Sequence, residues 1–96
     1  STDTTAALRA IEMNADILLK ATDVEGLFDR DPKKDPAAVK FDSISFNEVI
    51  SRGLAAMDLT AITLCREHRM PVRIFNINRE GNIIKAVTND IGTIIK

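Results

Sequence analysis

Hydroxyl and carboxylate side chains crowd the first residues of the chain, where a helix is predicted to begin. Ser1, Thr2 and Asp3 open the run STDTT, which apolar residues follow at helical spacing. The amino end of a helix offers free N–H groups and positive partial charge, so this run could hold a phosphate or a carboxylate. Asp3 could position a lysine or a magnesium ion in a site for phosphoryl transfer. Plain helix capping uses the same residue types, so spacing alone leaves both roles open.

A second group of candidate residues follows the first strongly apolar run of the chain. The run ILLKAT at residues 17–22 has the composition of a buried strand, and ligands gather beyond the carboxyl ends of such strands in open α/β sheets. Thr22, Phe28 and Asp31 come at or after this end, and they could hold a nucleoside through a hydroxyl, a ring contact and a carboxylate. A lysine pair further along the loop could screen phosphate charge. A solvated loop with a core phenylalanine would look the same.

Several other kinds of site are excluded because the sequence lacks their motifs. The sequence has no phosphate loop of the G-x-x-x-x-G-K-[ST] type, no G-x-G-x-x-G, no nucleophile elbow and no histidine-rich metal spacing. The lone His68 is predicted to lie in the last turn of a helix, where positive charge suits the helix dipole. Cys65 is predicted to be a small core residue. We therefore assign no residue of this chain as a metal ligand.

Composition is typical of one globular domain. The chain has 96 residues, 45% of them hydrophobic and 28% charged, with a formal net charge of -1. This near-neutral balance, without a basic cluster among aromatic residues, argues against a dedicated nucleic-acid binder. No apolar run reaches the roughly 20 residues that a membrane-spanning helix needs. A single cysteine cannot form an intramolecular disulfide, so we expect a reducing, cytoplasmic location.

The elements that must position these residues alternate between helices and strands. We expect helices at residues 3–14, 45–52, 58–70 and 83–87, and strands at residues 16–22, 39–44, 72–77 and 93–95. Helices interrupt the connections between the strands at 17–22, 72–77 and 93–95, which predicts that these three are parallel. The predicted fold class is α/β, with three α/β/α layers and a mainly parallel sheet. The loop from Thr22 to Ala38 is long for a small domain, and such loops are more often functional than idle.

Local signals mark the ends of two of these helices. Ser45 with Glu48 three residues later forms a capping box, and Asp58 is placed to cap the next helix. Gly53 and Pro71 are predicted to end the two helices.

Two stretches of the chain resemble bacterial uridylate (UMP) kinases of the amino-acid kinase superfamily. The pattern T-x-x-x-G-x-F-x-x-D-P from Thr22 to Pro32 is broad in the superfamily, whereas M-D-x-T-A-x-x-L from Met57 to Leu64 is narrower to UMP kinases. The likeness is colinear, covers essentially the whole chain and ends in the run GTII. It implies the carboxy-terminal, ATP-binding part of an amino-acid-kinase-like domain, spanning residues 1–96 as a single domain, with the amino-terminal half absent.

The resemblance also implies an activity and a role for each candidate residue. UMP kinases transfer the γ-phosphoryl group of ATP, with magnesium, to UMP and form UDP. The family's roles map here onto Ser1 and Thr2 for UMP binding, Asp3 for catalysis, and Thr22, Phe28 and Asp31 for ATP binding. The aspartate would organise basic groups around the transferring phosphate, and the phenylalanine ring would lie beside the adenine.

The likeness further implies binding partners, and it implies that these residues alone are not a complete enzyme. Family members are cytoplasmic homohexamers, activated by GTP and inhibited by UTP, and Mg²⁺ arrives with ATP without an assigned protein ligand. No nucleic-acid or membrane partner is expected. Because the amino-terminal half carries the glycine-rich phosphate loop, a catalytic lysine and most of the UMP pocket, these 96 residues alone are predicted to be inactive.

Two alternatives stay open on the sequence. The first keeps the superfamily and changes the phosphoryl acceptor to an amino acid, acetylglutamate or carbamate. The second is a freestanding module that senses ATP or UTP without catalysis. Phosphoryl-acceptor assays would separate the first alternative from a UMP kinase, and tight nucleotide binding without turnover would indicate the second.

Overall fold

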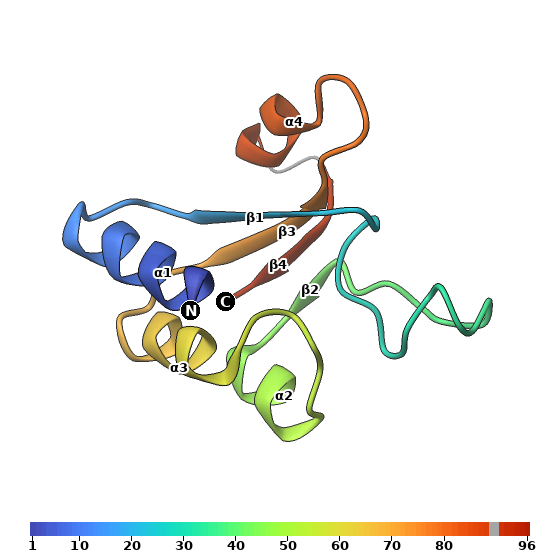
Figure 1. Cartoon of the computed structure of the whole chain (residues 1–96), viewed down its shortest axis with the longest axis horizontal. Coiled ribbons are helices and arrows are strands. Elements are labelled where there is room, and N and C mark those ends of the chain that lie inside the picture. The colour runs from blue at the N-terminus through green and yellow to red at the C-terminus, as the bar shows by residue number, and fades with distance from the viewer. Residues whose placement is uncertain (89–90) are drawn as a thin grey trace.

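One open sheet lies between helices on both of its faces (Figure 1). The computed structural model describes residues 1–88 and 91–96. Within them the sheet contains β1 (Leu18–Thr22), β2 (Ser43–Ile44), β3 (Val72–Asn76) and β4 (Thr93–Ile95), in the order β1-β3-β4-β2. The helices are α1 (Thr2–Glu12), α2 (Phe46–Ser51), α3 (Leu59–Glu67) and α4 (Asn82–Thr88). Figure 1 shows α1, α2 and α3 on one side of the sheet and α4 on the other, which confirms the predicted three-layer α/β fold.

One strand runs against its predicted direction. β1 and β3 are parallel, as are β2 and β4, but β4 is antiparallel to β3. The prediction that the three main strands are all parallel is therefore wrong for β4. Helix α4 follows β3 directly, and its Asn82 side-chain amide donates to the carbonyl of Asn76, the last residue of β3 (2.6 Å). The first residue of β4, Thr93, pairs with Ile74, so β4 begins toward the same end of β3 and runs back along it.

Capping residues place the helix starts where the sequence predicts them. The Ser45 hydroxyl accepts the Glu48 N–H (3.1 Å), and the Asp58 carboxylate accepts the Ala61 N–H (3.0 Å). Gly53 follows α2 with a φ of 62°. The predicted strand at residues 39–44 is shorter than expected, because only its last two residues join the sheet.

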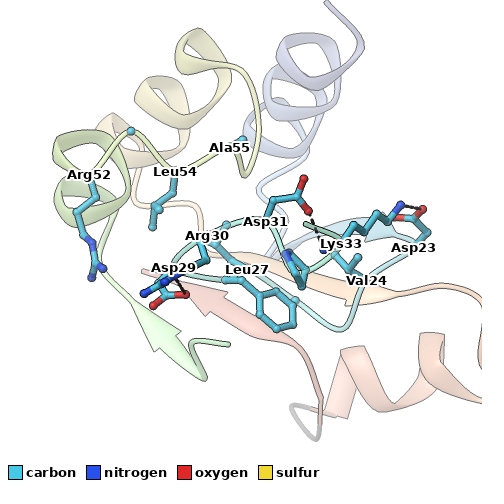
Figure 2. Close-up of a pocket in the computed structure, with 14 residues that line it drawn as sticks. Asp23, Val24, Leu27, Asp29, Arg30, Asp31, Lys33, Arg52, Leu54 and Ala55 are labelled. Carbon is cyan, nitrogen blue, oxygen red and sulfur yellow. Dashed lines mark hydrogen bonds and ion pairs between the residues drawn. The ribbon is translucent and has the colours of Figure 1, made fainter. Parts of the chain in front are cut away.

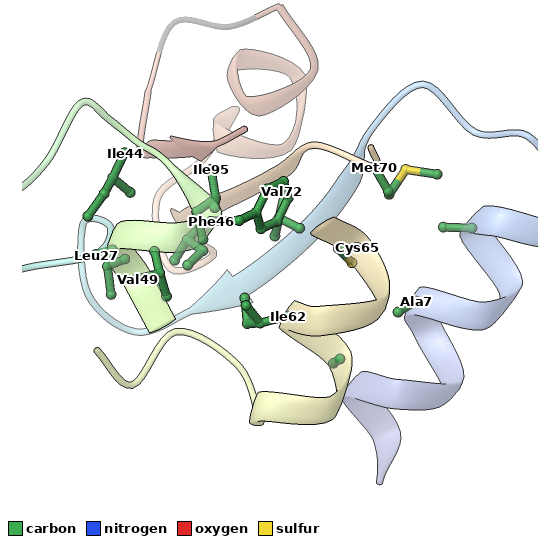
Figure 3. Packing of buried hydrophobic residues seen from close by; sticks show 13 residues of the cluster. Ala7, Leu27, Ile44, Phe46, Val49, Ile62, Cys65, Met70, Val72 and Ile95 are labelled. Atoms are coloured by element: carbon green, nitrogen blue, oxygen red, sulfur yellow. The ribbon is translucent and has the colours of Figure 1, made fainter. Parts of the chain in front are cut away.

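The core lies between the sheet and the helices α1, α2 and α3 (Figure 3). Helices α1 and α3 pack through small side chains, since Ala7, Ala61 and Cys65 are each 0% exposed. The apolar spacing of α1 predicts its buried face only in part, because Ile11 packs against the core whereas Leu8 is 44% exposed. Leu59, the first residue of α3, is 65% exposed. Cys65 is a buried core residue, as predicted.

None of the helices in residues 1–88 and 91–96 is long and apolar enough to cross a membrane.

Candidate nucleotide-binding site

A cleft opens where the long loop after β1 faces the connection between α2 and α3 (Figure 2). Its volume is about 540 Å³, and it is lined by Asp23, Val24, residues 26–33 and residues 52–55. We call this hollow the loop cleft. Figure 2 shows Arg52, Leu54 and Ala55 on one wall and Asp29, Asp31 and Lys33 on the other. Phe28 and Asp31, two of the three residues assigned to ATP, both line it.

The loop that forms one wall is closed at its base by backbone pairing. The Phe41 N–H donates to the Leu27 carbonyl (2.9 Å), and the Asp29 N–H donates to the Val39 carbonyl (3.0 Å). The Asp29 carboxylate also accepts the Val39 N–H (2.8 Å). Phe28 lies between these two rungs and pairs with Lys40 in an isolated antiparallel bridge. The loop is therefore a narrow hairpin with a fixed base, although its sequence shows no strand periodicity.

Asp31 forms the turn at the outer part of this hairpin. Its carboxylate accepts the Lys33 N–H (2.9 Å), and its carbonyl accepts the N–H groups of Lys34 (3.1 Å) and Asp35 (2.9 Å). These bonds fix the orientation of a carboxylate that is itself exposed on the cleft wall. A carboxylate so oriented can accept hydrogen bonds from hydroxyl or amine groups of a ligand.

Cations at the rim of the loop cleft are paired with carboxylates. Lys33 forms an ion pair with Asp23, which raises the pKa of Lys33 and lowers the pKa of Asp23. Arg30 pairs with Asp35 (3.0 Å), and the pKa of Asp35 is lowered by the Ala37 N–H first and by Arg30 second. The rim thus offers positive groups that an incoming phosphate would share with these carboxylates.

A second polar cluster joins α1 to β1. The Asp3 carboxylate accepts a hydrogen bond from the Lys20 ammonium group (2.7 Å), with side-chain exposures of 20% and 35% respectively. Its other oxygen accepts the Asp58 N–H (3.3 Å). The predicted ability of Asp3 to position a lysine is therefore matched by a real partner, Lys20.

The hydroxyl groups at the tip of α1 bond to the cap of α3. Ser1 and Thr4 (3.3 Å) donate to the Asp58 carboxylate. These contacts lower the pKa of Asp58, with the Ser1 hydroxyl as the largest cause and the Ala61 N–H next. Ser1 also caps its own helix by accepting the Thr4 N–H (3.2 Å). Helix capping is thus confirmed for Ser1, while its role in ligand binding stays a prediction.

The six predicted site residues fall into two groups joined by β1. Ser1, Thr2 and Asp3 lie at the amino end of α1 and are not among the residues that line the loop cleft. Thr22 ends β1 directly before the cleft residue Asp23. Lys20 and Thr22 project from the same face of β1, about 7 Å apart, because side chains alternate along a strand. One strand therefore leads from the Asp3 cluster to the cleft.

Sequence reasoning missed Lys20 and the second cleft wall, residues 52–55. In the sequence, Lys20 is only a polar residue near the end of a predicted strand. The signal that could have identified it is its position two residues before Thr22, which places both side chains on the same face of that strand. The second wall carries no motif, since Arg52 to Ala55 read only as a helix end.

Comparison with known proteins identifies the family of the chain. The sequence model described as the Amino acid kinase family matches residues 1–76. The chain belongs to the amino acid kinase family. A uridylate kinase from Pseudomonas putida is 52% identical over 97 residues, covering 100% of this chain and 39% of the relative. The chloroplastic uridylate kinase PUMPKIN from Arabidopsis thaliana is also 52% identical, over 99% of this chain and 28% of its own length.

A solved structure agrees with these sequence matches. The UMP kinase from Bacillus anthracis superposes on 100% of the chain with a TM-score of 0.95 and 33% sequence identity. The match covers 40% of that structure. The chain thus spans about two fifths of the length of its bacterial relatives, and it corresponds to their carboxy-terminal part.

Proposed function

We propose that this chain is the carboxy-terminal, ATP-binding portion of a UMP kinase, which transfers the γ-phosphoryl group of ATP to UMP and forms UDP for pyrimidine nucleotide synthesis. The observation that carries the proposal is the 52% identity to a uridylate kinase over the whole chain. The fold supports it, because the UMP kinase of Bacillus anthracis superposes over the same full length.

The loop cleft is the proposed site of the donor nucleotide. Its volume of about 540 Å³ is in the range of pockets that bind small molecules and cofactors. Phe28 supplies an aromatic surface for the adenine, and Asp31 supplies an oriented carboxylate for hydroxyl or amine groups of the nucleoside. Thr22, at the end of β1, would place its hydroxyl toward the phosphates, since β1 leads from the cleft to the Asp3 cluster.

The Asp3 cluster is the proposed transfer site. Phosphoryl transfer is catalysed mainly by positioning and by positive groups that stabilise charge on the transferring phosphate. Asp3 holds the Lys20 ammonium group at 2.7 Å, so Lys20 is a candidate for such a group in this part of the enzyme. Ser1 and Thr2 lie at the tip of the same helix, where N–H groups and hydroxyls suit the acceptor phosphate.

Mg²⁺ would enter with ATP. Among residues 1–88 and 91–96, no three histidine, cysteine, aspartate or glutamate side chains lie close enough together to hold a metal ion. Magnesium commonly uses one or two carboxylates together with substrate phosphates, so we propose an ion held chiefly by the triphosphate. When bound, the ion would neutralise charge on the phosphates.

Assembly and regulation follow from the same family likeness. We propose a homohexamer in the cytoplasm, activated by GTP and inhibited by UTP. One relative at 52% identity is named as chloroplastic, so relatives of this chain are found in more than one compartment.

A hybrid enzyme tests the proposed activity. In this hybrid, residues 1–96 replace the matching carboxy-terminal segment of the Pseudomonas putida uridylate kinase. We expect the hybrid to form UDP from UMP and ATP with Mg²⁺, and we expect the isolated 96-residue chain to form none, since we propose that the other groups of the transfer site lie in the amino-terminal part. The unmodified Pseudomonas enzyme is the positive control.

The outcome separates the proposal from its rivals. A hybrid that is folded by circular dichroism and forms no UDP contradicts the proposed function. Phosphorylation of aspartate, glutamate, acetylglutamate or carbamate in place of UMP would assign another acceptor. UDP formation by the isolated chain would contradict its predicted inactivity.

A further inference from the structure

Thr93 connects the last strand to the loop that forms the cleft. It is the first residue of β4 and is 0% exposed, although it lies 66 residues after Leu27 in the chain. Its hydroxyl accepts the Leu27 N–H (2.9 Å) and donates to the Phe41 carbonyl. Leu27 and Phe41 are the two residues that pair with each other at the base of the hairpin (2.9 Å). A single buried hydroxyl therefore bonds both sides of that base.

Neighbouring contacts tighten the same junction. A Cβ atom at Gly26 would stand 2.6 Å from the Thr93 hydroxyl oxygen, so only glycine fits there without a shift. The Lys40 ammonium group donates to the Gly92 carbonyl (3.0 Å). Gly92 has a φ of 79° and lies against the backbone of Ile74, which ties this anchor to β3 at the centre of the sheet.

We propose that Thr93 is a positioning residue for the donor nucleotide, an inference that rests on the proposed function. Thr93 does not line the loop cleft, so it acts through the hairpin that carries Phe28 and Asp31. Without its hydroxyl, the buried Leu27 N–H loses its hydrogen-bond partner, and an unsatisfied buried donor is costly. The base of the hairpin would then open, and the two ATP residues would lose their fixed places.

The consequence is selective for one substrate. The Asp3 cluster is built from α1, β1 and the start of α3, whereas the Thr93 hydroxyl bonds to Leu27 and Phe41 among the residues that the structure describes. Loss of the hydroxyl should therefore weaken ATP while leaving the acceptor side in place. Stability should fall in either case, whereas a merely structural role for Thr93 would affect both substrates alike.

Thr93→Val and Thr93→Ser in the hybrid enzyme form the test. Valine keeps the shape and removes the hydroxyl, whereas serine keeps the hydroxyl. We expect Thr93→Val to raise the KM for ATP at least about tenfold, since it removes two buried hydrogen bonds and one of average to high strength is worth about that factor. The KM for UMP and the turnover number at saturating ATP should stay within about twofold, and Thr93→Ser should restore the KM for ATP.

Two control variants separate positioning from general damage. Thr63→Val removes a hydroxyl that bonds within α3 to the Leu59 carbonyl (2.8 Å), and it should change neither KM. Ile62→Val removes a methylene from the core, where Ile62 is 2% exposed, and it should lower the melting temperature without a selective rise in the KM for ATP. A Thr93→Val hybrid that resembles Ile62→Val, or weakens both substrates equally, would overturn the inference.

Lys40→Met provides a second way to loosen the same junction. It removes the bond to the Gly92 carbonyl from a side chain that is 30% exposed, so folding should survive the change. If Thr93→Val does not fold, a selective rise in the KM for ATP in Lys40→Met supports the inference, and an unchanged KM overturns it.

Failure of the proposed function can be told apart from failure of this inference. If the unmodified hybrid binds ATP and forms no UDP, the proposed function fails, and the effect of Thr93→Val is then measured as a change in the dissociation constant for ATP.

Discussion

Asp31 is the residue whose substitution separates donor from acceptor binding most cleanly. Asparagine keeps an oxygen that can accept the Lys33 N–H, a bond of 2.9 Å in the protein, so Asp31→Asn should preserve the turn and remove only the charge. We expect the KM for ATP of the hybrid enzyme to rise about three- to tenfold, the cost of weakening one charged hydrogen bond, with the KM for UMP unchanged. Steady-state kinetics with each substrate varied check this. Equal losses for both substrates would remove Asp31 from the donor site.

Substitution of Asp3 should change the turnover number more than the KM for either substrate. Asp3→Asn leaves Lys20 without the carboxylate that holds it at 2.7 Å, so we expect the turnover number to fall at least about tenfold with smaller changes in either KM. Residues that act as a unit are not additive, so Asp3→Asn combined with Lys20→Met should be little worse than the more severe single variant. Fully additive losses would show that Asp3 does not act through Lys20, and an unchanged turnover number would remove Asp3 from catalysis.

Individual site residues also differ in how well the sequence predicted their partners. The sequence identified Asp3 as a residue that could position a lysine, because a carboxylate at a helix start is a recognisable pattern. It did not identify Lys20 as that lysine, because the pairing depends on how α1 crosses β1. Phe28 and Asp31 were predicted from chemistry in a loop, yet the wall opposite them belongs to residues 52–55, whose types suggest only a helix end.

At the scale of elements, Asp58 ties α1 to α3 and makes this junction sensitive to acid. The pKa of Asp58 is lowered in the folded protein by the hydroxyl of Ser1, so its contribution is present above the ordinary Asp pKa of 3.8. It declines as pH falls below that value and is lost through the lower folded pKa. Asn can still cap α3, so Asp58→Asn should lower the melting temperature at pH 7 mainly through the α1 contacts. This difference from the unmodified hybrid should be constant above the ordinary Asp pKa and shrink as pH falls further below 3.8; a difference that does not shrink in acid would contradict the assignment.

The contact between α1 and α3 depends on small residues. Ala61 is 0% exposed at this contact, so Ala61→Leu should overpack it and destabilise the protein by about 1–3 kcal/mol. Leu59 in the same helix is 65% exposed, and Leu59→Ala should change the free energy of unfolding by less than about 0.5 kcal/mol. Chemical denaturation of both variants of the hybrid measures these values. Similar effects at the two positions would mean that α1 does not pack on α3 as the structure shows.

Elements were predictable where their signals are local. The caps at Ser45 and Asp58 were predicted because a capping side chain bonds within three residues of itself. The direction of β4 was not, because it depends on where α4 lies relative to β3, an arrangement between elements that no local signal in the sequence gives. Apolar spacing was right for Ile11 and wrong for Leu8, since close helix packing on α1 buries small alanines in place of the larger leucine.

At the scale of the whole molecule, residues distant in sequence converge on one end of a sheet. The loop after β1, the connection between α2 and α3, and the start of β4 together form and anchor the loop cleft. Families are recognised from motifs along the chain, but this convergence comes from the strand order β1-β3-β4-β2, which brings β4 beside β3 and within reach of the loop. The account therefore rests on the claim that the cleft is where the donor nucleotide binds.

Photolabelling of the hybrid enzyme with 8-azido-ATP tests that claim most directly, with mass spectrometry to locate the label. We predict label within residues 22–33 and 52–55, suppressed by an excess of ATP and unaffected by UMP. Phe28→Ala should reduce labelling, because the proposed adenine contact is lost. Label found only outside both walls of the loop cleft, and still suppressed by ATP, would contradict the account.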